Sequence, residues 1–140
     1  DLVKYQIMVA AGYKVDLTNL VKRNHTIECR INAENAKDFS PSPGTINFIN
    51  VPGGRGVRID TALYTNYKVN PHYDSLVLKI VSKGKDRNEA ISIMKRSLDE
   101  IIIDGIDTNI ELHKWILNQK EFIDGTYNTN WLEKNISRFN

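Results

Sequence analysis

The chain has 140 residues, 41% of them apolar and 26% charged, which suits one globular domain that buries its own core. A net charge of +2, with no stripe of Lys and Arg, excludes a strongly basic nucleic-acid-binding surface. No stretch reaches the ~20 apolar residues of a membrane span, and a single cysteine excludes a disulfide framework. We therefore expect a reducing, cytoplasmic setting with no membrane and no nucleic-acid partner.

The first twelve residues predict a helix and its end. Apolar residues recur at helical spacing through residues 2–11, and Gly12 is well placed as the C-terminal cap. The chain opens without Met, and a helix that begins at the first residue suggests a chain cut from a longer protein. Residues 13–24 are polar and mixed, which predicts a connector to the next element.

Residues 25–34, HTIECRINAE, predict a strand with one dry face and one wet face. Apolar and polar side chains alternate at a period of two, as in a strand that covers a core on one side. The dry face carries Ile27, Cys29, Ile31 and Ala33, and the wet face carries Glu28, Arg30, Asn32 and Glu34. The wet face raises the question of whether Arg30 is only solvated or belongs to a site.

Residues 41–84 predict three further strands separated by turns. Proline and glycine predict turns at PSPG, residues 41–44, and PGGRG, residues 52–56, and a loop is predicted at residues 70–75. LVLKIVSKG, residues 76–84, predicts a strand more buried than its neighbours, because it begins with a continuous apolar run. The other two strands are marked by Ile46, Phe48 and Val51, and by Val57, Ile59 and Leu63 with Arg58 and Asp60 on the opposite face.

The remainder of the chain predicts helices. Asp86 with Glu89 and Thr108 with Glu111 have the spacing of capping boxes, and Thr129 opens a short last helix. An apolar stripe continues the first of these helices up to Gly105; it consists of Ala90, Ile91, Met94, Leu98, Ile101 and Ile102. Strands followed by helices, rather than alternating with them, predict an α+β fold: an antiparallel sheet with helices packed on one side.

Several patterns that resemble chemical sites are better explained by structure. The glycines of residues 53–56 lack the spacing of a dinucleotide or phosphate loop and predict a tight turn. His25, His72 and His113 lie far apart without ligand-like spacing, so no metal site is predicted. Cys29 points into the core by strand parity, where a thiol is inert.

Arg30 permits two interpretations from pattern alone. It is either a solvated or ion-paired strand residue, with Asp60 and Asp74 as plausible partners, or a fixed cation for an oxygen ligand. Arginine stays charged at physiological pH and offers a planar fork to oxygen, which suits a site where negative charge develops.

Six segments in order, HTIECRINAE, PSPGTI, PGGRGVRID, NPHYDSLVLKIV, IIIDGIDTNI and GTYNTNWLEK, resemble the C-terminal domain of biotin carboxylase. The similarity covers essentially all 140 residues, and the ECRINAE and PSPG segments resemble the bacterial acetyl-CoA carboxylase component most. The resemblance implies a ligase activity in fatty acid synthesis, in which ATP activates bicarbonate and CO2 passes to the ureido N1 of biotin on a carrier protein.

The resemblance also implies roles for named residues. Arg30 matches the arginine that stabilises negative charge on the ureido oxygen, and Arg30 and Asp74 are implied to bind biotin. Arg58 matches a residue of the family's homodimer interface, whereas Arg55 replaces an aromatic residue there. A charge in place of an apolar anchor predicts a more polar or weaker dimer.

The same resemblance implies what this chain does not carry. ATP and magnesium bind an ATP-grasp region that precedes residue 1, and residues 1–12 resemble its tail, so we expect no ATP or metal site here and no activity of the fragment alone. The implied partners are the biotin carboxyl carrier protein, carboxyltransferase subunits and a second copy of the full-length enzyme. The alternative is a non-catalytic module that binds other subunits or a carrier.

Overall fold

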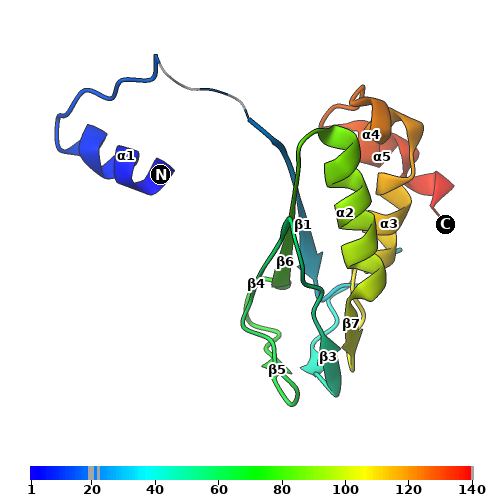
Figure 1. Cartoon of the computed structure of the whole chain (residues 1–140). Coiled ribbons are helices and arrows are strands. Elements are labelled where there is room, and N and C mark those ends of the chain that lie inside the picture. Colours follow the sequence, from blue (N-terminus) through cyan, green and yellow to red (C-terminus); the bar gives the residue numbers. More distant parts are fainter. Residues whose placement is uncertain (19–20, 22, 140) are drawn as a thin grey trace.

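A computed structural model describes residues 1–18, 21 and 23–139, and its centre is a three-stranded antiparallel sheet (Figure 1). The strand order is β1-β6-β4, with β1 at His25–Asn32, β6 at Leu76–Gly84 and β4 at Val57–Thr61. The predicted strand at residues 76–84 is confirmed, and the one predicted at 25–34 is confirmed except that it ends two residues earlier, at Asn32. β6 is the most buried strand because strands pair with it on both sides. The connector predicted at 13–24 lies partly outside the described residues.

Helices cover one face of this sheet, which confirms the predicted α+β fold (Figure 1). They are α2 (Arg87–Glu100), α3 (Ile110–Leu117), α4 (Lys120–Asp124), α5 (Trp131–Asn135) and a 3-10 turn, η1 (Ile136–Arg138). Helix α2 packs on β6 and β1, and α3 and α4 pack beside α2. The core between sheet and helices contains Cys29, Ile31, Leu78, Ile80, Ile91, Met94, Leu98, Ile101, Ile110 and Leu117. The dry face of β1 therefore faces these helices, and its wet face is turned away from them.

Two small sheets extend the fold around a second apolar cluster. β2 (Gly44–Thr45) pairs with β5 (Lys68–Val69), and β3 (Phe48–Asn50) pairs with β7 (Ile102–Asp104). They surround buried Ala33, Ile46 and Val69. The single strand predicted through Ile46, Phe48 and Val51 is thus wrong, because the chain bends between β2 and β3 to join two different partners.

The turn predicted at PSPG is also misplaced. Residues 36–38 form the turn, whereas Pro41 forms an isolated bridge with Glu34 and Gly44 already belongs to β2. Leu63 lies outside β4, which ends at Thr61. Strand pairing therefore overrides the local preference of proline and glycine for a turn.

Helix α2 begins as predicted but ends earlier. Asp86 is the N-cap of α2, and its side chain accepts a hydrogen bond from the Glu89 N–H at 2.9 Å. The second bond of a capping box is not formed, because the Glu89 carboxylate accepts from the Lys85 N–H instead of the Asp86 N–H. The predicted continuation to Gly105 is wrong, because Ile101 is extended (ψ 133°) and β7 follows. Three consecutive isoleucines at 101–103 favour a strand, since β-branched residues fit a sheet better than a helix.

The predicted starts of the later helices differ by one residue from the observed ones. Asn109 rather than Thr108 is the N-cap of α3, and Asn130 rather than Thr129 is the N-cap of α5. Neither asparagine side chain caps its own helix. Helix α4 was not predicted, and Gly125 ends it with a left-handed φ of 72°.

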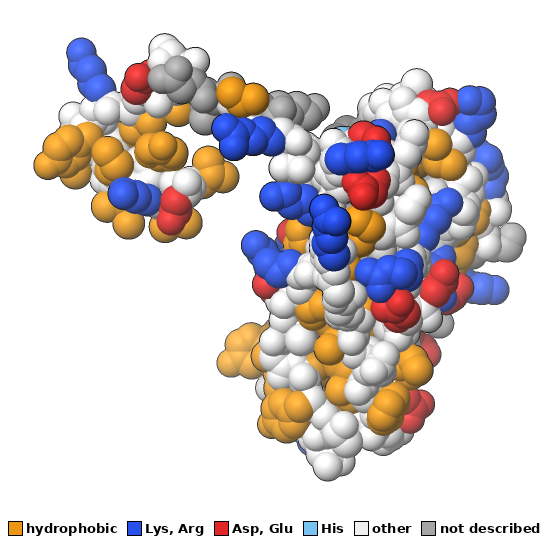
Figure 2. Space-filling view, in the orientation of Figure 1, with side chains coloured by type: hydrophobic (Ala, Val, Ile, Leu, Met, Phe, Trp, Pro, Cys, Tyr) orange, Lys and Arg blue, Asp and Glu red, His pale blue; other side chains and the backbone are white. Residues whose placement is uncertain are grey.

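Helix α1 (Leu2–Ala10) stands apart from the sheet and helices (Figure 1). Gly12 has a φ of +84°, its N–H donates to Val9 O and the Tyr13 N–H donates to Met8 O, which together form a Schellman end. No residue of α1 is buried, and Leu2 is 82% exposed; apolar side chains gather on this helix in Figure 2. Among the described residues, no helix is long and apolar enough to cross a membrane.

Candidate functional site

The polar face of the β1-β6-β4 sheet carries a row of charged side chains across three strands. Arg30 on β1 lies opposite Lys79 on β6, and Lys79 lies opposite Asp60 on β4. Directly opposite residues on antiparallel strands have Cβ atoms about 5 Å apart, so these charges are neighbours. Arg30 thus lies opposite another cation, Lys79, whereas the acid of the row, Asp60, lies one strand further away on β4.

The Arg30 side chain is exposed and unpaired. Within the described part of the chain, its guanidinium makes no ion pair and no hydrogen bond. Both acids predicted as its partners are engaged elsewhere: Asp60 pairs with Arg58 at 2.7 Å, and the Asp74 carboxylate accepts a hydrogen bond from the Leu76 N–H at 2.8 Å. The ion-pair interpretation of Arg30 with these two acids is therefore wrong, and the guanidinium fork is available to a ligand.

The backbone under Arg30, in contrast, is held from the side of α3. Its carbonyl accepts hydrogen bonds from Asn109 Nδ2 at 3.2 Å and from His113 Nε2 at 2.9 Å. Burial lowers the pKa of His113, although its bond to the Arg30 carbonyl opposes that shift. His113 is therefore a neutral donor at physiological pH, and its bond holds the backbone of β1. Neither the bond from His113 nor the one from Asn109 was predicted from the sequence.

Asp74 lies at the end of a loop that is tied to the far end of β1. The Ala33 N–H donates to Ser75 O at 2.8 Å, and the Ser75 hydroxyl donates to the Glu34 carboxylate. Glu34 also accepts from Asn32 Nδ2 at 3.3 Å. The buried Asn32 Oδ1 has no hydrogen-bond partner among the described residues. The structure thus brings the segment that carries Asp74 to the end of the strand that carries Arg30, but does not join the two side chains.

The glycine turn at residues 52–56 is confirmed as a turn rather than a phosphate loop. Gly54 and Gly56 have φ values of +99° and +78°, and β4 follows where a phosphate loop needs a helix. A Cβ at Gly56 would lie 2.6 Å from Lys83 O, so this position requires glycine. Arg55 is exposed at the tip of the turn, and Arg58 is bound to Asp60 on β4.

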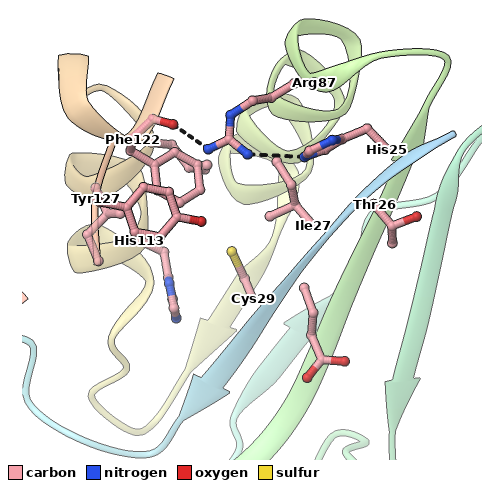
Figure 3. Close-up of a pocket in the computed structure, with 11 residues that line it drawn as sticks. His25, Thr26, Ile27, Cys29, Arg87, His113, Phe122 and Tyr127 are labelled. Atoms are coloured by element: carbon pink, nitrogen blue, oxygen red, sulfur yellow. Dashed lines mark hydrogen bonds between the residues drawn. The ribbon is translucent and has the colours of Figure 1, made fainter. Parts of the chain in front are cut away.

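A cavity of about 520 Å³ lies on the helical side of β1 (Figure 3), and Arg30 is not among its lining residues. Arg87 at its rim donates to Ile123 O at 3.1 Å, to Phe122 O and to His25 Nε2 at 3.1 Å. These bonds join the start of β1 to the end of α4. Arg87 is therefore used in holding the helices to the sheet, and the cavity offers no free cation of its own among its described lining residues.

Cys29 lines the same cavity and is chemically inert. Burial raises the pKa of its thiol to about 12, and the neighbouring Glu28 carboxylate adds to the shift. The thiolate, which is the nucleophilic form, is thus absent near neutral pH. Among residues 1–18, 21 and 23–139, no cluster of three or more His, Cys, Asp or Glu side chains is arranged to hold a metal ion.

Comparison with known proteins identifies the family. The sequence profile of the biotin carboxylase C-terminal domain matches residues 28–134. The chain belongs to this family. Biotin carboxylase of Pseudomonas aeruginosa is 47% identical over 138 residues, which cover 97% of this chain and 31% of that protein. A pyruvate carboxylase component from Methanothermobacter thermautotrophicus is also 47% identical, over 96% of this chain and 28% of that protein.

Solved structures agree with this family assignment. The biotin carboxylase domain of Hydrogenobacter thermophilus 2-oxoglutarate carboxylase, a dimer in complex with MgADP and bicarbonate, has a TM-score of 0.87 and 38% identity. The match covers 100% of this chain and 32% of that one. This biotin carboxylase C-terminal domain therefore spans about a third of the length of the relatives it matches.

Proposed function

We propose that this chain is part of an ATP-dependent biotin carboxylase, in which Arg30 stabilises negative charge on the ureido oxygen of biotin. The observation that carries the proposal is an exposed guanidinium without a partner in the described part of the chain, held on a strand whose backbone is fixed by α3. Its family membership supports the same role, because the ECRINAE segment around Arg30 lies within the matched residues.

The chemistry requires such a cation. A ureido nitrogen is a very weak acid, and its loss of a proton places negative charge on the ureido oxygen. A fixed guanidinium stabilises that oxygen more strongly in the transition state than in the neutral ground state, which is the condition for catalysis. Arg30 offers a planar fork for two hydrogen bonds, and its like-charged neighbour Lys79 adds to the positive potential of this face.

Other residues of the chain have supporting roles in this proposed function. Asp74 binds biotin beside Arg30, since the Asp74 loop is tied to the end of β1. Arg55 and Arg58 belong to a homodimer interface, which the dimeric 2-oxoglutarate carboxylase domain supports. Residues 1–12 are the tail of an ATP-grasp region, and the exposed apolar surface of α1 supports a contact with such a region.

ATP and magnesium bind to that region rather than to this chain. The proposal assigns no step of the reaction to a metal held by this chain, and among the described residues no group of three or more His, Cys, Asp or Glu side chains is arranged to hold one. The carrier protein with its biotin and the carboxyltransferase subunits are the proposed partners, and the cytoplasm is the proposed location. Acetyl-CoA carboxylase and fatty acid synthesis are the proposed context, although a pyruvate carboxylase component is equally similar.

The test is Arg30→Lys in the full-length enzyme that contains this chain. Lysine keeps the charge but loses the fork, so carboxylation of free biotin falls by about 10²–10³ while the affinity for ATP stays unchanged. Arg96→Lys is the matched control, because Arg96 pairs with Glu100 within α2 and donates a hydrogen bond to Gly53 O. Normal carboxylation by Arg30→Lys would favour the alternative, a module that binds other subunits or a carrier without taking part in the chemistry.

A further inference from the structure

Asn109 occupies the N-cap position of α3, but its side chain does not cap the helix. An asparagine at this position normally accepts a hydrogen bond from the second or third N–H of the helix, which is worth about 1 kcal/mol. The Asn109 side chain makes no such bond with α3. It is one of the few buried polar residues, 7% exposed, and its amide is directed across to β1 instead.

Both ends of the Asn109 amide bind the backbone of β1 on either side of Ile31. Its Oδ1 accepts from the Asn32 N–H at 2.9 Å, and its Nδ2 donates to Arg30 O at 3.2 Å. The Asn109 backbone N–H also donates to Asn32 O at 3.3 Å. His113 adds a second donor to Arg30 O, at 2.9 Å. Four hydrogen bonds from Asn109 and His113 thus converge on two residues of an edge strand, Arg30 and Asn32.

This segment of β1 needs outside support. The pairing of β1 with β6 shifts between Ile31 and Asn32, so the ladder becomes irregular one residue after Arg30. β1 is also an edge strand, because β6 is its only strand neighbour in the sheet among the described residues. An irregular edge leaves backbone groups unpaired and the strand direction poorly defined. Asn109 supplies the missing partners at this point.

We propose that Asn109 is a positioning residue for the reaction, which fixes the backbone of Arg30 so that its guanidinium meets the developing oxyanion. The proposal rests on the proposed function of Arg30. Asn109 lies on the helical side of β1 and acts through the main chain, so it does not touch the substrate. A displacement of about 1 Å in a positioned catalytic group costs roughly 10²-fold in rate. His113 contributes a second donor to the same carbonyl and keeps part of the support when Asn109 is changed.

The experiment uses the full-length enzyme with Asn109→Ala, and with Asn109→Asp as a second variant. Aspartate keeps an acceptor for the Asn32 N–H but places a second oxygen against Arg30 O, so it removes the donor to Arg30 and adds a charge at a buried position. We expect both variants to lower kcat for biotin carboxylation by about 10–100-fold, with ATP affinity unchanged. Ser97→Ala is the matched control, since Ser97 is fully buried and its hydroxyl bonds only Ile93 O within α2.

A double-mutant cycle with Arg30→Lys separates positioning from general damage. If Asn109 acts through Arg30, its substitution costs little further rate once Arg30 is lysine, because coupled residues are not additive. Losses that multiply, a parallel loss of ATP affinity, or a rate equal to that of Ser97→Ala would overturn the proposal. If Arg30→Lys itself is fully active, the proposed function fails. If Arg30→Lys is impaired and both Asn109 variants are normal, only the positioning role fails.

Discussion

Gly105→Ala is expected to destabilise the domain strongly, because Gly105 has no room for a side chain. This glycine has a φ of +105°, and a Cβ built on it would lie 2.0 Å from Thr45 O and 3.0 Å from the Asn47 N–H nitrogen. An ordinary carbon–oxygen contact is about 3.3 Å or more, so the β7 end and the β2–β3 connection must separate by about 1 Å.

Two costs add to give the magnitude. An L-residue at this φ costs about 1–3 kcal/mol, and overpacking of a tight contact costs about 1–3 kcal/mol. Together they predict a loss of about 4 kcal/mol in the free energy of unfolding. Domains of this size are stable by only about 5–15 kcal/mol, so a loss of about 4 kcal/mol removes between about a quarter and most of that stability.

Urea unfolding followed by circular dichroism measures this loss, with Gly53→Ala as the matched control. Gly53 has no atom within 4 Å of a built Cβ and no positive φ, so alanine there is expected to be neutral or slightly stabilising. A difference of less than about 1 kcal/mol between the two variants would refute the packing argument for Gly105.

Two further predictions concern assembly and pH. In the full-length enzyme the dimer is expected to weaken as the salt concentration rises. Arg55→Phe is expected to tighten the dimer, because an aromatic anchor replaces a charge that must be desolvated. Sedimentation velocity at low and high salt measures both effects, and a wild-type dimer that does not respond to salt would contradict this prediction. Because burial holds the pKa of His113 below 6.5, its contribution to stability is complete above pH 6.5 and is lost as the pH falls through the lowered pKa. In the His113→Gln variant, glutamine keeps a donor for Arg30 O but does not titrate. The free energy of unfolding of this variant should therefore fall less on acidification than that of the wild type. Urea unfolding between about pH 5 and about pH 8 measures the difference.

The elements that follow a strong local period were predictable, and those that depend on distant partners were not. The alternation in residues 25–34 and the apolar start of 76–84 give β1 and β6 from sequence alone. β2, β5 and β7 have only two or three residues each, which is too short for a period to emerge. The isoleucines at 101–103 continue the helical stripe of α2, and only pairing with β3, about fifty residues earlier, makes them a strand.

The sequence predicts Arg30 as the central residue of the candidate site, but it does not predict which residues contact Arg30. Pattern alone left Arg30 between two interpretations, and the resemblance to a family selected one. Asp60 lies two residues from Arg58 on the same face of β4, and this local pairing, visible in the sequence, competes with any pairing to Arg30 two strands away. Thr108 and Asn109 are both accepted at a helix N-cap, so the sequence offers no local signal that the Asn109 side chain instead bonds a residue 79 positions before it.

The order of the strands along the chain has a consequence for synthesis on the ribosome. Every pair in the three sheets joins strands that are not successive in sequence: β1 with β6, β4 with β6, β2 with β5 and β3 with β7. Such pairings fold slowly because long loops must close first. The bond from Asn109 to Arg30 spans 79 residues, so at about 5–20 residues per second the strand with Arg30 waits about 4–16 s for its support. During that interval the charges of Glu28 and Arg30 on its exposed face protect the nascent strand from pairing with neighbouring chains.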